Sequence, residues 1–263
     1  MSLRARASGL SDVGVIRSHN EDCFDIDPEN QVFVVADGMG GHSHGEIASR
    51  LAIDAIKDFV ERTADQDATL PFEMDPKLGR HGNRIRAAIR VAHDRVLKAI
   101  RQDSSLHGMG TTVVGLLLDG DSAAVAHVGD SRAYRFRDGR LELLTQDHTW
   151  VNEQVVAGFL SEEQARSHPL KNVVTRALGG DTDVDIDVRE WPVEEGDLFL
   201  LCSDGLTTML TDDEILSRVR STERPEEICG RLVRDANARG GYDNVSVVLV
   251  RMEPNEGASE DTS

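Results

Sequence analysis

Residues 111–144 read TTVVGLLLDGDSAAVAHVGDSRAYRFRDGRLELL. Four runs within them have the apolar, β-branched composition of strands: 111–118, 123–128, 133–137 and 141–144. Asp119-Gly120 lies between the first two runs and Asp138-Gly139 between the last two. An Asp-Gly pair between apolar runs is a strong signal for a tight hairpin turn. A hairpin joins antiparallel neighbours, so this segment predicts an antiparallel sheet.

Periodic patterns on both sides of this segment complete the layout. Before it, apolar residues recur at helical spacing over 45–64 and 83–102. Further strand-like runs occupy 32–37, 183–189, 197–202 and 245–252. Short helices are expected after a capping box at 211–214 and over 228–236. This mixture predicts one α+β domain with helices packed outside antiparallel sheets.

Two segments depart from the regular pattern. Residues 148–180 have weak periodicity, and we expect a partly helical excursion between strands, of the kind that forms a flap. Residues 253–263, EPNEGASEDTS, have nothing to bury. We therefore expect a single domain over residues 1–252, followed by an acidic disordered tail at 253–263.

Composition excludes several classes of protein. The 263 residues include 47 acidic and 29 basic side chains, a net charge of −18 that would repel nucleic acid and anionic membranes. Cys23, Cys202 and Cys229 form no CxxC pair, which excludes a disulfide framework and a structural zinc cluster. No window reaches the roughly 18 apolar residues of a membrane helix, and no signal-peptide core is present, so we expect a cytoplasmic protein.

Acidic residues collect where strands are expected to end. Asp37-Gly38 and Asp204-Gly205 each follow an apolar run, and such a position holds a carboxylate rigidly at the edge of a sheet. A single Asp there is more often a turn or capping residue. The same setting recurs, however, at Asp130, Asp243 and Glu21. Several carboxylates can converge only where something offsets their repulsion, and divalent cations do so.

The types of side chain indicate which cation. These positions offer oxygen atoms, and no paired His or Cys has the spacing of a zinc site, which favours Mg²⁺ or Mn²⁺. Two such ions can share a bridging water, lower its pKa and direct it at phosphorus. Arg17 lies four residues before Glu21, and its guanidinium is suited to bidentate hydrogen bonding with phosphate oxygens. A surface ion pair is the more common role for one such arginine.

Eight short motifs stand in order along the chain: 17–22 (RSHNED), 37–42 (DGMGGH), 110–112 (GTT), 129–132 (GDSR), 144–148 (LTQDH), 175–179 (TRALG), 203–205 (SDG) and 243–244 (DN). Together they resemble the motifs of the PP2C-type metal-dependent serine/threonine phosphatases, in their compact bacterial branch. The resemblance runs from about residue 9 to residue 251. It implies a central β-sandwich of two antiparallel sheets flanked by helices on both sides, with metals at one end.

The same resemblance implies an activity and its residues. The activity is hydrolysis of phosphoserine and phosphothreonine in proteins, by a water or hydroxide that bridges two Mn²⁺ or Mg²⁺ ions. Arg17 would bind the substrate phosphate, and residues 148–171 would form the flap. The implied ligands are Asp37 on both ions, Asp204 and Asp243 on the first, Glu21 and the Gly38 carbonyl on the second, and Asp130 with Asp204 at a weaker third site. A serine/threonine kinase acting on the same proteins is the expected functional partner.

One position departs from the family pattern. In animal relatives a His directly follows the Asp-Gly pair and is proposed as the general acid, whereas Met39 stands here. His42 is nearby, although a hydrogen bond within the loop is the better interpretation of it. The general acid is therefore unassigned.

Two other functions are less consistent with the sequence than the phosphatase. A nucleotide-binding loop at 38–41 is disfavoured, because Ser43 occupies the third glycine position and the hairpins that follow do not build a parallel sheet. A catalytically silent relative that binds phosphoproteins should have lost a metal carboxylate, and none is missing.

No long exposed apolar stripe stands out, so we expect a monomer.

Overall fold

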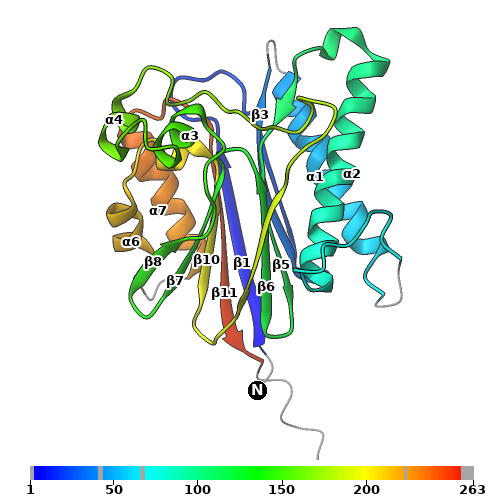
Figure 1. The fold of residues 1–263 in the computed structure, drawn as a ribbon. Coiled ribbons are helices and arrows are strands. Elements are labelled where there is room, and N and C mark those ends of the chain that lie inside the picture. The colour runs from blue at the N-terminus through cyan, green and yellow to red at the C-terminus, as the bar shows by residue number, and fades with distance from the viewer. Residues whose placement is uncertain (1–2, 41–43, 66–68, 222–223, 256–263) are drawn as a thin grey trace, which may run out of the picture.

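The computed structural model describes residues 3–40, 44–65, 69–221 and 224–255. Two antiparallel sheets pack face to face in it (Figure 1). The first sheet has the order β1 (Leu3–Asp12), β11 (Val245–Pro254), β10 (Leu198–Cys202), β7 (Arg132–Arg137) and β8 (Arg140–Leu143). The second has the order β2 (Asp22–Asp27), β3 (Val32–Met39), β5 (Val113–Asp119), β6 (Ser122–Val128) and β9 (Asp187–Pro192), with β4 (Gly110–Thr111) paired to β3.

Helices cover both outer faces of this sandwich, as predicted (Figure 1). The second sheet is covered by α1 (His44–Arg62) and α2 (Arg80–Gln102), which the short η1 (Ser104–Leu106) follows. The first sheet is covered by α5 (Asp204–Thr207), α6 (Asp212–Val219) and α7 (Pro225–Ala238). The remaining helices, α3 (Trp150–Val156) and α4 (Glu162–Ser167), lie in the predicted flap. In the ranges that the structure describes, no helix combines the length and apolarity needed to cross a membrane.

Alternation along the central strands explains why their sequences are apolar throughout. In β3, Phe33 and Val35 face the other sheet, whereas Val32, Val34 and Ala36 face the layer of α1 and α2. Successive side chains of a strand point to opposite faces, so a strand between a sheet and a helical layer is buried on both sides. The same alternation in β10 fills the core between the sheets and the core beneath α7.

The predicted hairpins and helices are confirmed. β5 joins β6 through Gly120, which has φ of +60°, and β7 joins β8 through Asp138 and Gly139, with φ of +49° and +76°. These left-handed values are the ones that Asp-Gly turns supply. Capping boxes open α4 at Ser161 and α6 at Thr211.

The structure differs from the prediction at several strands. The strand predicted at 183–189 begins only at Asp187, because its partner β6 ends at Val128, opposite residue 186, and offers no neighbour to residues 183–185. β1 and β2 were not predicted as strands. β11 continues to Pro254, two residues beyond the predicted domain boundary at 252, because it pairs with β1 along its whole length. Residues 256–263 of the predicted tail lie outside the described residues.

Candidate metal centre

The predicted site residues lie near strand ends that meet at one end of the sandwich. Asp37 is near the end of β3, and its Cα partner on β2 is Asp22. Asp204 is the first residue of α5 and is separated from β10 by Ser203 alone, and Asp243 stands two residues before β11. The strand ends at which the sequence places these acids are therefore brought together by the sheet topology.

Backbone contacts hold Asp37 and Gly38 in place. The Asp37 N–H donates to Thr112 Oγ1 over 3.2 Å, and the Thr112 N–H donates to the Asp37 carbonyl over 2.9 Å. A Cβ on Gly38 would lie 2.1 Å from the Gly45 carbonyl oxygen. Glycine is required because the end of β3 passes this close to the start of α1.

Glu21 contacts the same strand end. The Gly38 N–H donates to the Glu21 carbonyl over 3.1 Å, and the Glu21 N–H donates to Asn244 Oδ1 over 2.8 Å. Glu21 Oε1 accepts the Gly45 N–H over 3.1 Å, at the start of α1, where the helix dipole favours a negative charge. Its carboxylate thus lies next to Gly38, and it also caps α1.

Arg17 binds one of the predicted metal ligands directly. Its Nη2 atom donates to Asp243 Oδ2 over 2.7 Å, and 52% of the Arg17 side chain is exposed. This bond, and the nearby Glu21 and Asp37, raise the pKa of the guanidinium despite partial burial. Asn244 holds the Arg17 loop against β11, because its Nδ2 donates to the carbonyls of Val13 and His19 over 2.9 Å each.

The carboxylates at this end of the sandwich raise one another's pKa. Burial, and then repulsion from Asp22 and Asp204, raises the pKa of Asp37 well above its ordinary value. Burial and the charge of Asp243 raise the pKa of Asp204 to about 6. For Asp130, burial and the charge of Asp204 raise the pKa to about 7. Acids in this situation are stabilised by a bound cation, so these residues fit a divalent metal.

Asp22 belongs to this group, although the sequence analysis assigned it no role. It is buried, and burial raises its pKa to about 7. Ser203 Oγ donates to its Oδ2 over 2.8 Å, whereas its buried Oδ1 has no hydrogen-bond partner among the described residues. The signal that identifies Asp22 is its register opposite Asp37, which the sequence does not reveal.

Met39, at the position of the family's proposed acid, ends β3 and pairs with Gly110 on β4. Its thioether has no proton to donate. His42 lies outside the described residues. The general acid therefore stays unassigned.

His148 fixes the backbone beside Asp130. The backbone N–H of His148 donates to the Gly129 carbonyl over 3.0 Å, and the ring Nδ1 of His148 accepts the Gly129 N–H over 3.1 Å. Gly129 has φ of +104°, a conformation that favours glycine. Since His148 is also the first residue of the predicted flap, the base of the flap is tied directly to the residue before Asp130.

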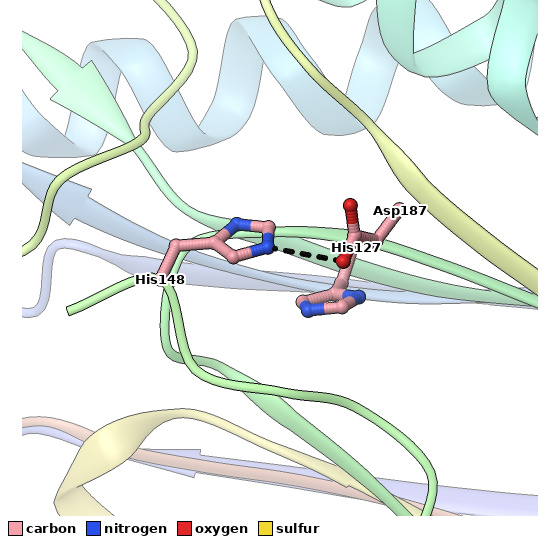
Figure 2. A group of neighbouring side chains, drawn as sticks. All are labelled: His127, His148 and Asp187. Carbon is pink, nitrogen blue, oxygen red and sulfur yellow. Dashed lines mark ion pairs between the residues drawn. The ribbon is translucent and has the colours of Figure 1, made fainter. Parts of the chain in front are cut away.

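A second group of possible ligands lies behind this clamp. Among the described residues, His127, His148 and Asp187 are the one set of three His, Cys, Asp or Glu side chains whose ligand atoms lie within 4.8 Å of one another (Figure 2). The two imidazole rings stack at 4.6 Å. The predicted carboxylates do not form such a compact set, which agrees with their mutual repulsion. The sequence does not indicate this group, because only the register of β6 with β9 and the packing of the following loop bring its members together.

Hydrogen bonds account for the two histidines without a metal. His148 Nδ1 accepts from Gly129, so the ring hydrogen is on Nε2, which lies 3.4 Å from Asp187 Oδ2. His127 Nε2 lies 2.8 Å from the Gln146 carbonyl and donates to it. A metal on His148 Nε2 would displace the ring hydrogen to Nδ1. Because a protonated Nδ1 cannot accept a hydrogen bond, the contact with the Gly129 N–H would be lost. We therefore interpret this group as a structural network.

Comparison with known proteins extends over nearly the whole chain. A family model described as Protein phosphatase 2C matches residues 17–234. The chain is 35% identical over 246 residues to the serine/threonine phosphatase stp of Listeria monocytogenes. The alignment covers 92% of this chain and 94% of that protein. It is 34% identical over 250 residues to the serine/threonine protein phosphatase PstP of Mycobacterium tuberculosis. This alignment covers 95% of this chain and 45% of that longer protein.

Solved structures have the same fold. The crystal structure of the Mycobacterium tuberculosis phosphatase PstP/Ppp has a TM-score of 0.85 at 34% identity and covers 97% of this chain and 100% of that one. The PstP catalytic domain in complex with two manganese ions has a TM-score of 0.83 at 32% identity, and covers 96% of this chain and 100% of that one.

Proposed function

The chain belongs to the protein phosphatase 2C family and is a serine/threonine protein phosphatase, and we propose that the carboxylates at the end of its sandwich hold the metals of the reaction. One observation carries this proposal: buried acids from different strand ends raise one another's pKa. A cation relieves that repulsion. The relative crystallised with two manganese ions supports two Mn²⁺ or Mg²⁺ sites here. A weaker third site is proposed from the family resemblance alone.

The proposed ligands are those of the sequence analysis. They are Asp37, Asp204 and Asp243 for the first ion, Asp37, Glu21 and the Gly38 carbonyl for the second, and Asp130 with Asp204 for the third. All offer oxygen, which suits hard divalent ions. When bound, the ions would supply a more acidic water as nucleophile and would offset charge on the phosphoryl oxygens.

Arg17 is the proposed phosphate-binding residue. Its bond to Asp243 uses one of five guanidinium N–H groups, and the side chain is half exposed, so further donors can face a phosphate. The bond to Asp243 also orients the guanidinium before substrate arrives, which favours binding in a single geometry.

The finer assignments remain predictions. We propose phosphorylated proteins as substrates and a serine/threonine kinase as the enzyme that produces them, because a phosphomonoester hydrolase needs a source of its ester. A monomeric state and a cytoplasmic location are predictions from the sequence alone.

The test is hydrolysis of p-nitrophenyl phosphate and of a phosphothreonine peptide with Mn²⁺, before and after exhaustive chelation. We expect activity with both substrates and its loss on chelation. Asp37→Asn and Asp204→Asn should each lose at least about 100-fold in kcat, the order of effect of removing one transition-state-stabilising group. The matched control is Asp54→Asn, since Asp54 is an exposed acid on α1.

The outcomes separate the alternatives. Activity that survives chelation would refute the metal assignment. A wild-type protein inactive with every divalent ion, yet able to bind the phosphopeptide, would favour the silent regulator. Wild-type activity in Asp37→Asn would show that the ligands are wrongly assigned.

A further inference from the structure

Large apolar side chains are exposed beside the candidate metal centre. Within the described ranges, five are more than 60% exposed: Val15 at 62%, Ile16 at 64%, Val156 at 68%, Phe159 at 77% and Tyr242 at 62%. Clustered apolar exposure commonly marks a contact surface. Val15 and Ile16 directly precede Arg17, and Tyr242 directly precedes Asp243. We call Val15, Ile16 and Tyr242 the apolar rim.

The apolar rim is built from two segments that are fixed to each other. The N–H groups of Val15 and Ile16 donate to the Gly241 carbonyl over 2.8 and 3.2 Å. A Cβ on Gly241 would lie 2.8 Å from Val15 Cγ2, so the Val15 side chain packs directly over this glycine. The Tyr242 ring packs over Gly240 in the same way, with Cε2 3.0 Å from where a Cβ would be.

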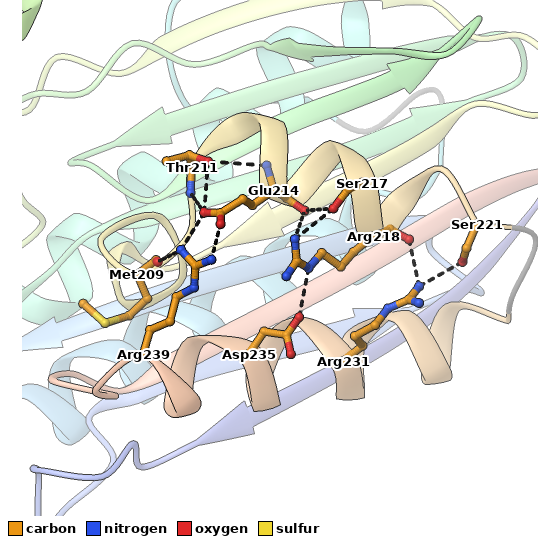
Figure 3. Close-up of polar contacts among 9 residues, drawn as sticks. All are labelled: Met209, Thr211, Glu214, Ser217, Arg218, Ser221, Arg231, Asp235 and Arg239. Carbon is orange, nitrogen blue, oxygen red and sulfur yellow. Dashed lines mark hydrogen bonds and ion pairs between the residues drawn. The ribbon is translucent and has the colours of Figure 1, made fainter.

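A polar network holds the second of these segments (Figure 3). Arg239, which follows α7, binds the carboxylate of Glu214 on α6 and donates to the Met209 carbonyl over 3.3 Å. Arg218 of α6 donates to Asp235 of α7 over 2.9 Å. The turn that carries Tyr242 and Asp243 therefore leaves a fixed helix end, and the apolar rim is in place before a ligand binds.

We propose that the apolar rim binds a bulky apolar side chain of the substrate, close in sequence to the phosphorylated residue. This proposal rests on the proposed function, because Arg17 must hold the phosphate. The rim residues are sequence neighbours of Arg17 and Asp243, and an extended peptide advances about 3.5 Å per residue. An apolar side chain within about three residues of the phosphate can therefore reach the rim.

The chemistry of the surroundings favours such a peptide over a second copy of the chain. The rim residues directly precede Arg17 and Asp243, which are hydrogen-bonded to each other, so an occupant that presents a phosphate to Arg17 lies beside the rim. A second copy with a net charge of −18 would bring further acidic surface to this acidic end.

The experiment uses phosphothreonine peptides in which one serine is replaced by leucine, at each position from three before to three after the phosphothreonine. For each enzyme, we measure the ratio of kcat/KM between the leucine peptide and the serine parent, with Mn²⁺. The wild-type ratio should reach about tenfold at one position, which is the effect of burying roughly half a leucine side chain. Because it is a ratio, general changes in turnover cancel.

Four variants locate the effect. Ile16→Ser and Tyr242→Ser should each bring the ratio close to one. Met74→Ser is the matched control, since Met74 is 51% exposed in the loop before α2, and it should keep the wild-type ratio. Phe159→Ser removes the most exposed apolar side chain of the flap, and should also keep most of the preference.

Several results would overturn the proposal. These are a wild-type ratio near one at every position, a preference that survives both rim substitutions, or a preference that only Phe159→Ser removes. A dimer that forms with rising concentration, dissociates in Ile16→Ser and shows no leucine preference would assign the rim to a second copy. If wild-type enzyme with Mn²⁺ also fails to hydrolyse p-nitrophenyl phosphate, the proposed function fails and the rim proposal with it. Hydrolysis of that ester without a peptide preference refutes the rim alone.

Discussion

Asp22→Asn should stabilise the metal-free protein at alkaline pH and much less at acid pH. Asp22 is buried opposite Asp37, and burial together with the charges of Asp204 and Asp243 opposes its ionisation. Asparagine has nearly the same shape, can accept the hydrogen bond from Ser203 and carries no charge. The substitution therefore removes an electrostatic cost that exists only when the carboxyl would be ionised.

The size of the effect follows from the linkage between protonation and folding. The pKa of Asp22 is about 7 in the folded protein, against 3.8 as the ordinary value. A carboxyl whose pKa is raised by folding contributes stability below its unfolded pKa, and that stability is lost as the pH rises through the folded pKa. Between pH 5 and pH 8, the loss is about 2 to 3 kcal/mol. Asp22→Asn should abolish it.

The assay is urea unfolding of both proteins with chelator at pH 5 and pH 8. The free energy gained by Asp22→Asn should be larger at pH 8 by about 2 to 3 kcal/mol. Costs that do not depend on pH, such as an unpaired amide where Asp22 Oδ1 has no partner, cancel in this difference. An equal effect at both pH values, or a larger gain at pH 5, would refute the reasoning.

Three further predictions concern neighbouring contacts. Arg17→Lys should lower kcat/KM for p-nitrophenyl phosphate by roughly 10- to 100-fold, since an ammonium cannot bind phosphate in a bidentate manner; an unchanged value would contradict the assignment. Gly38→Ala should lower the free energy of unfolding by about 1 to 3 kcal/mol, because its Cβ meets the Gly45 carbonyl; Gly230→Ala in α7, where the Cβ meets only the end of the Arg234 side chain at 3.3 Å, serves as the control in thermal melting. His148→Ala should speed proteolysis within residues 149–171, because the clamp on Gly129 is lost, and an unaltered cleavage rate would show that the flap is held elsewhere.

The sequence predicted those parts of the fold that depend on local chemistry. The turns at Gly120 and Gly139 need positive φ, and the boxes at Ser161 and Thr211 need particular side chains three residues apart, so short patterns identify them. β1 was missed because Arg4 and Arg6 alternate with alanines, which resembles a basic tail. Its strand conformation depends on pairing with β11, which lies more than 200 residues away in the chain.

The candidate site divides in the same way. Asp37, Asp204 and Asp243 could be selected because each lies beside an apolar run, and strand ends are visible in sequence. The role of Asp22 depends on its register opposite Asp37. The contact of His127 with His148 depends on the turn between the two sheets. Register and inter-sheet contacts arise from tertiary packing, so a single sequence does not reveal them.

The pairing of β1 with β11 has a consequence for synthesis on the ribosome. In the described sheet, β1 has β11 as its neighbour, and Asn244 beside that strand holds the loop that carries Arg17. While translation is still in progress, the first strand therefore has nothing to pair with, and its long-range partner must be awaited. A nascent polypeptide stalled before residue 243 would lack Asp243 and the Asn244 contacts that hold the Arg17 loop, so the candidate metal centre can assemble only after the start of β11 has been synthesised.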